Sequence, residues 1–174
     1  MALDWTKIGV LVFLASILQA SVFSDVTILG GTPDVLLVTL VAVALLRGAI
    51  VGASAGFFAG LLLDTATLGT MGFTSLLLTL VGYWVGRYGE TTGRDRSHAP
   101  FLAVAVVTFL YALGALILHF MLGDPAPARH VLIGTLLQDI ALNLLVTIPI
   151  YALARRVLKP GERAERIEGV RFLG

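Results

Sequence analysis

Glycine recurs at every fourth position of one apolar segment of this chain. The residues are Gly48, Gly52, Gly56 and Gly60, and Asp64 follows at the same interval. Residues four apart lie on one face of a helix, so the segment predicts a helix with a glycine ridge that ends in a carboxylate. In lipid, helices associate through close backbone approach along such small residues. The pattern therefore predicts that this helix packs tightly against a neighbouring helix.

A shorter glycine pair stands later in the chain. Gly82 and Gly86 repeat the four-residue spacing within another apolar segment. The simplest interpretation is that the two glycine-bearing helices pack together within one chain. The alternative is that the glycine ridge meets another protein, either a second copy in a homodimer or the membrane helix of a partner.

The composition is that of an integral membrane protein. Of the 174 residues, 57% are hydrophobic and only 13% are charged, whereas about a quarter of the residues in a soluble domain are charged. The chain has no cysteine, which excludes disulfides and thiol chemistry. No stripe of basic residues interleaved with aromatic ones is present, so nucleic-acid binding is not expected.

Six apolar segments predict an all-α membrane domain over residues 1–159. A crossing helix needs about 20 apolar residues and must satisfy its backbone polar groups within its own segment. The expected spans are residues 8–24, 33–47, 48–64, 69–88, 99–122 and 131–156. Residues 160–174 alternate in charge and predict a cytoplasmic tail, or a short helix on the membrane surface.

The apolar run over residues 33–64 is divided at its one basic residue, Arg47. As a single helix the run would be about 48 Å long, which exceeds a hydrocarbon core of about 30 Å. A tight turn at Arg47 and Gly48 makes two short helices and lets Arg47 reach the headgroups. A five-span alternative buries Arg47 instead, at a cost of at least about 2.5–3.5 kcal/mol.

The distribution of basic residues predicts the orientation. With six spans and both termini in the cytoplasm, every lysine and arginine except Arg129 lies inside, as the positive-inside rule requires. With five spans and an external N-terminus, Lys7 joins Arg129 outside. We therefore expect a multi-pass protein with both termini cytoplasmic.

Polar side chains within apolar spans are expensive, and each is a functional candidate. They are Gln19, Asp64, His119, Gln138, Asp139 and Asn143. For Asp64 we expect hydrogen bonds to the turn that follows the third span, with binding of a partner or ligand as the alternative. His119 has no second histidine at the spacing of metal ligands, so neither a metal site nor a cofactor is expected.

Asp139 and Asn143 are the most informative of these polar residues. They lie one turn apart on one helix face, and a carboxylate at this depth needs a partner. One interpretation is an internal packing network that includes Gln138 and Thr147. The alternative is a path for protons or a substrate.

Enzyme signatures are missing from the sequence. There is no Gly-x-Ser-x-Gly motif, no phosphate-binding glycine-rich loop with lysine, and no His-Glu-x-x-His motif. The sequence therefore predicts a protein without catalytic residues.

In several of these features the sequence resembles the MreD family of rod shape-determining proteins. The resemblance covers the full length, and its most specific part is the Gly-Phe-Phe-Ala-Gly-Leu-Leu-Leu-Asp block from Gly56 to Asp64. Gln19, Gly82-Tyr83 and Asn143 also suit the family. The residues that match its pattern are Pro33, Asp34, Gly56, Gly60, Asp64 and Gly69. Asp139 has no assigned place in the pattern.

The resemblance implies a non-enzymatic scaffold of the bacterial cell-elongation machinery in the inner membrane. Such a scaffold binds the bitopic protein MreC and, through it, works with MreB, RodA and the elongation penicillin-binding protein in peptidoglycan synthesis and cell shape. The family is similar in helix count to the substrate-binding subunits of energy-coupling-factor transporters. That similarity gives the alternative function, a membrane subunit that binds a small, vitamin-type molecule.

Overall fold

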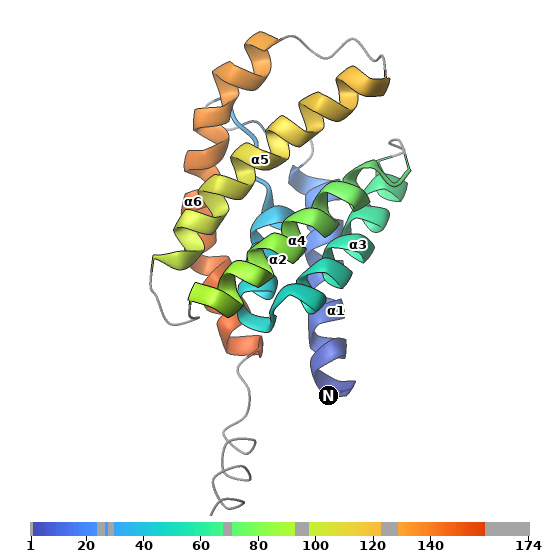
Figure 1. Ribbon diagram of the computed structural model, residues 1–174, viewed down its shortest axis with the longest axis vertical. Coiled ribbons are helices and arrows are strands. Elements are labelled where there is room, and N and C mark those ends of the chain that lie inside the picture. Colours follow the sequence, from blue (N-terminus) through green and yellow to red (C-terminus); the bar gives the residue numbers. More distant parts are fainter. Residues whose placement is uncertain are drawn as a thin grey trace, which may run out of the picture.

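The computed structural model describes residues 2–23, 27, 30–67, 71–92, 98–122 and 129–158. These residues form helices and no β-strand element (Figure 1), which confirms the predicted all-α class for the described part of the chain. In chain order the helices are α1 (Ala2–Leu18), the π-helical segment η1 (Gln19–Phe23), α2 (Val35–Arg47), α3 (Ala49–Ala66), α4 (Phe73–Thr92), α5 (Ala99–Leu122) and α6 (Arg129–Leu158).

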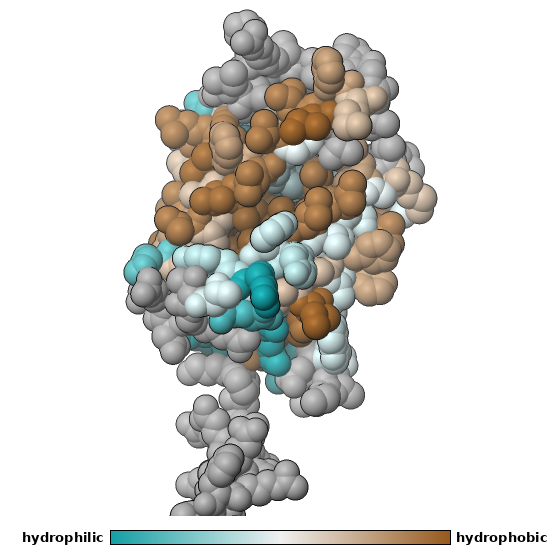
Figure 2. Space-filling view, in the orientation of Figure 1, coloured by the Kyte–Doolittle hydropathy of each residue, from teal (hydrophilic) through white to brown (hydrophobic). Residues whose placement is uncertain are grey.

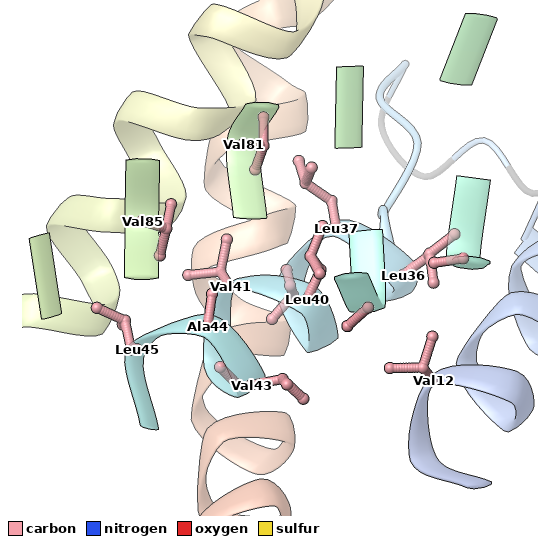
Figure 3. Packing of buried hydrophobic residues seen from close by; sticks show 14 of the residues in the cluster. Val12, Leu36, Leu37, Leu40, Val41, Val43, Ala44, Leu45, Val81 and Val85 are labelled. Carbon is pink, nitrogen blue, oxygen red and sulfur yellow. The ribbon is translucent and has the colours of Figure 1, made fainter. Parts of the chain in front are cut away.

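Helix α2 is the centre of the molecule. Ten consecutive residues, Leu36 to Leu45, are buried, and a helix that is hydrophobic on all sides must be covered on all sides. Figure 3 shows Val12 of α1 and Val81 and Val85 of α4 converging on the α2 side chains. The other helices therefore form a shell around α2.

Four of the described helical segments are long and apolar enough to cross a membrane. They are Trp5–Val22, Ala49–Ala66, Ala99–Ile117 and Thr135–Leu158. Helix α2 has only 13 residues and is about 20 Å long, and α4 is not among the four. The chain is thus a membrane protein with four candidate spans in its described part, and six crossings stay a prediction.

The ends of the short helices differ from the expected spans for identifiable reasons. Helix α2 begins at Val35 rather than at residue 33, because the Asp34 carboxylate accepts a hydrogen bond from the backbone of Leu37 and forms the N-cap. The fourth helix begins at Phe73 rather than at residue 69, after a turn in which Gly72 has a φ of 91°. A positive φ is accessible to glycine at little cost.

The break between α2 and α3 lies at Gly48, where the sequence predicted it. Gly48 has a φ of 92° and donates its backbone N–H to the Ala44 carbonyl, which closes α2. Arg47 is half-buried, and its guanidinium donates to the carbonyl of Leu158 at 3.1 Å. The residue that was expected to reach the headgroups therefore has a partner within the protein, at the last turn of α6.

Polar residues gather at one end of the molecule. Figure 1 shows that α1 begins and α6 ends at this same end. In Figure 2 the face formed by α4 and α5 is mostly hydrophobic, with the hydrophilic residues concentrated toward that end. A broad apolar band beside a polar end is the surface expected of a protein that lies in a bilayer.

Candidate functional site

The glycine ridge of α3 lies directly against α4. A Cβ atom added to Gly52 would overlap the carbonyl oxygen of Gly82, and one added to Gly56 would overlap the carbonyl oxygen of Leu78. At Gly60 the overlap would be with the backbone of Ser75. Helix α4 thus covers the ridge along its length, and only glycine permits this backbone approach.

The second glycine pair contributes to the same contact from α4. A Cβ atom on Gly82 would overlap the carbonyl of Gly52, and one on Gly86 would lie 2.5 Å from the Cα of Ala49. The two glycine motifs therefore face each other within one chain. We call α3 and α4 together the α3–α4 hairpin.

A carboxylate caps a helix at each end of the α3–α4 hairpin. Asp64, at the last turns of α3, accepts hydrogen bonds from the backbone N–H groups of Gly72 at 2.9 Å, Thr74 at 3.2 Å and Ser75 at 3.4 Å. Its side chain is buried, with 3% of its surface exposed. Because the first N–H groups of a helix lack internal partners and attract negative charge, Asp64 is suited to hold the start of α4.

Glu90 has the corresponding role at the other end. Its Oε1 accepts a hydrogen bond from the backbone N–H of Ala49 at 2.9 Å, at the first turn of α3. A Cβ atom on Gly48 would overlap this carboxylate and displace it from Ala49, and the positive φ of Gly48 also favours glycine. Each helix of the hairpin therefore caps the other.

A second group of polar side chains surrounds the non-helical segment that leads into α2. Asp139 Oδ1 accepts from the backbone N–H of Thr32 at 2.7 Å, and Asn143 Oδ1 accepts from that of Asp34 at 2.7 Å. Gln19 Oε1 accepts from the backbone N–H of Val35 at 2.9 Å. We call Gln19, Asp34, Asp139 and Asn143 the α2 polar cluster.

Side chains of the cluster accept hydrogen bonds from successive backbone N–H groups of this segment. Pro33, between Thr32 and Asp34, has no N–H to satisfy and is buried. Further on, the Asp34 carboxylate accepts from Leu37 at 2.8 Å, and the Asp34 carbonyl accepts from Val38 at 3.1 Å. Non-helical backbone at membrane depth requires this kind of satisfaction by surrounding protein.

Asn143 also links two long helices to the cluster. Its Nδ2 donates to Thr108 Oγ1 of α5 at 3.1 Å. Within α6, Thr147 Oγ1 donates to the backbone carbonyl of Asn143 at 2.6 Å. Asn143 is 1% exposed. One amide side chain therefore joins α5 and α6 to the start of α2, near the middle of α6.

The arrangement is suited to positioning helices rather than to chemistry. Each side chain of the α2 polar cluster accepts from a backbone N–H, which holds the start of α2 in place. In the part of the chain that the structure describes, no group of three or more histidine, cysteine or acidic side chains could hold a metal ion.

Some candidates from the sequence lie outside this account. Gly69, the His119 side chain and residues 160–174 are outside the described residues. Gln138 lies beside the cluster, since its Cβ would be 2.8 Å from a Cβ atom added to Gly31.

Sequence reasoning missed several members of these two sites. Thr108 carries no motif, and Glu90 stands in a polar helix end where acidic residues are common. The Gly-Gly-Thr-Pro sequence at residues 30–33 is typical of a turn, but it does not indicate that Gly31 and Thr32 lie against α6.

Comparison with protein families gives one match that covers most of the chain. Residues 2–157 match the family model described as rod shape-determining protein MreD. No curated protein and no solved structure gave a significant match.

Proposed function

Since the chain belongs to the MreD family of rod shape-determining proteins, we propose that it is a scaffold that binds MreC in the inner membrane. The family is one of structural membrane proteins that determine cell shape. Through MreC the scaffold would work with MreB, RodA and the elongation penicillin-binding protein to regulate peptidoglycan synthesis. The observation that carries the proposal is the family match over residues 2–157.

The use of the intramembrane polar residues supports a scaffold over a catalyst or transporter. Asp64, Asp139, Asn143 and Gln19 all accept hydrogen bonds from backbone N–H groups of the chain itself. Each of these side chains therefore already has a partner within the chain. Here they hold helix ends in place, which favours a rigid surface for another protein.

We propose that the single span of MreC docks on an outward apolar face. The glycine ridge is covered by α4, so it does not need a second protein to fill it. Large apolar side chains are exposed on α1, α5 and α6, among them Ile17, Leu110 and Leu145. Because lipid offers equally apolar contacts, docking on such a face depends on shape and close packing.

The positive-inside rule supports an orientation with both termini on the cytoplasmic side. Helix α1 begins and α6 ends at the same end of the molecule (Figure 1), where Lys7, Arg155 and Arg156 are found. Lys and Arg concentrate on the cytoplasmic side of membrane proteins. We therefore propose that both termini are cytoplasmic and that α2 and α4 complete six crossings.

Crosslinking from single cysteines tests this proposal directly, because the chain has none of its own. We would place cysteine at Ile17, Leu110 or Leu145, coexpress MreC with a cysteine scan of its span, and measure disulfide formation. The buried Leu78, 1% exposed, is the matched negative position. We expect strong crosslinks from one face and none from Leu78. If none of the three exposed positions gave stronger crosslinks than the buried position Leu78, MreC docking on these faces would be contradicted.

The transporter-subunit alternative has a separate test. It requires a polar-lined cavity and a retained small molecule, which native mass spectrometry of the purified protein would detect. A stoichiometric vitamin-type ligand would support that alternative against the scaffold. We expect no such ligand and an MreC-bound species when the two proteins are coexpressed.

A further inference from the structure

An apolar groove of about 530 Å³ lies between α1 and α6. Helix α1 lines one side with Val10, Leu14 and Leu18, and α6 lines the other with Leu153 and Val157. This volume is in the range of about 300–1,000 Å³ that is typical of sites for small ligands.

The groove is as deep as one leaflet of a bilayer. Its lining on α1 runs from Thr6 to Leu18, a rise of about 18 Å, against a full hydrocarbon core of about 30 Å. Its floor is formed by Val35 and Thr39 of α2, close to the level at which α2 begins. A spanning helix of a partner would extend well beyond a groove of this length, whereas an acyl chain of one leaflet would not.

A positive charge stands at the mouth of the groove. Lys7 lines it at the end where α6 finishes, and no ion pair joins Lys7 to any side chain that the structure describes. A lysine can lay its apolar stem along such a groove and keep its ammonium group at the headgroup level. Arg156 follows Leu153 by three positions, which puts a second cation on the adjoining face of α6.

We propose that this groove is a binding site for an anionic phospholipid. One acyl chain lies between α1 and α6, and the phosphate lies at Lys7 with Arg156 beside it. The apolar walls give affinity for the chain, and the cation gives preference for a headgroup with net negative charge, as basic sites on the cytoplasmic side of membrane proteins do. The site is independent of MreC binding and does not rest on it.

Native mass spectrometry of the delipidated full-length protein tests the proposal. We would titrate phosphatidylglycerol and phosphatidylcholine with identical acyl chains and compare their occupancies. We expect phosphatidylglycerol to bind more tightly to the unmodified protein. Removal of the charge by Lys7→Gln should weaken phosphatidylglycerol about fivefold and leave phosphatidylcholine unchanged, while Lys7→Arg should retain the preference.

A variant that fills the groove separates it from the general lipid surface. Leu153 is 57% exposed, so Leu153→Trp should fold and should reduce the binding of both lipids. Leu110→Trp, on the exposed face of α5, is the matched control and should change neither. The proposal is overturned if both lipids bind equally to the unmodified protein, or if Leu153→Trp leaves phosphatidylglycerol binding intact.

Discussion

At the two ends of the α3–α4 hairpin, each helix start is held by a carboxylate from the other helix of the pair. Asp64 holds the start of α4, and Glu90 holds the start of α3. The start of α2 is held differently, by Gln19 from the chain before it and by Asp139 and Asn143 from α6. One region is closed within about 40 residues of sequence, and the other joins parts of the chain more than 100 residues apart.

The difference separates a local unit from a global one. The α3–α4 hairpin has its own close contact and its own caps, so these interactions involve no other helix. The α2 polar cluster is complete only when η1 and α6 are both in place, and Asn143 also bonds to Thr108 of α5. Damage to the hairpin should therefore destroy one packing unit, whereas damage to the cluster should loosen the whole bundle.

The largest effect is expected from filling the glycine ridge. Gly56→Leu would force side-chain atoms into the backbone of α4 at Leu78, and we expect a loss of at least about 3 kcal/mol of stability or failure to fold. Thermal unfolding in detergent would measure it. Gly9→Leu is the control, because a Cβ atom at Gly9 meets nothing within 4 Å. Equal stability of the two variants would contradict the close packing of the hairpin.

Removing the amide that joins three helices should have the next largest effect. Asn143→Leu leaves the Asp34 backbone N–H and the Thr108 hydroxyl without their partner, and we expect a loss of about 2–3 kcal/mol. Thr108→Val removes only the second of these bonds and should cost about 1 kcal/mol. The same unfolding measurement on both variants would show the difference. If Thr108→Val were as damaging as Asn143→Leu, the bond to Asp34 would carry no weight.

The cap at the start of α4 should be worth less than the α2 polar cluster. Asp64→Ala leaves the N–H groups of Gly72, Thr74 and Ser75 unsatisfied, and we expect a loss of about 1–2 kcal/mol. Hydrogen exchange should show faster opening in the first turn of α4 than elsewhere. Thr67→Ala, at an exposed residue after α3, is the control and should leave that turn protected.

The smallest effect is expected from neutralising the other cap. Glu90→Gln keeps an oxygen that can accept from Ala49 and loses the exposed contact with Arg87 at 3.5 Å. Exposed ion pairs are worth about 0–1 kcal/mol, so we expect a change near the low end of that range. Glu90→Ala should be more damaging, because it removes the acceptor as well. A larger loss in Glu90→Gln would mean that charge, rather than hydrogen bonding, holds the start of α3.

The sequence was sufficient to predict the hairpin. The four-residue glycine spacing in both helices carries the contact, and the turn at Gly48 follows from the excessive length of one helix over residues 33–64. Asp64 was expected to bond to the following turn, and its carboxylate accepts hydrogen bonds from the backbone N–H groups of Gly72 and of the first residues of α4. Such features depend on short-range periodicity and on helix length, which a single sequence displays.

The α2 polar cluster could be predicted only in part. Gln19, Asp139 and Asn143 stood out as polar residues in apolar spans, and the i, i+4 spacing put the last two on one helix face. Their acceptor role toward Thr32 and Asp34 could not be predicted, because helical spacing carries no information about which distant loop a face meets. The role of Thr108 could not be predicted either, because a threonine in an apolar helix often bonds only within its own helix.

We propose that the intramembrane carboxylates act as hydrogen-bond acceptors that hold helices, and not as proton carriers or catalytic groups. The most direct measurement is MreC co-purification and restoration of rod shape by Asp139→Asn beside Asp139→Leu. The amide of asparagine can still accept from the Thr32 N–H, so we expect Asp139→Asn to retain both properties and Asp139→Leu to lose them. A folded Asp139→Asn protein that binds MreC but cannot restore rod shape would contradict the account.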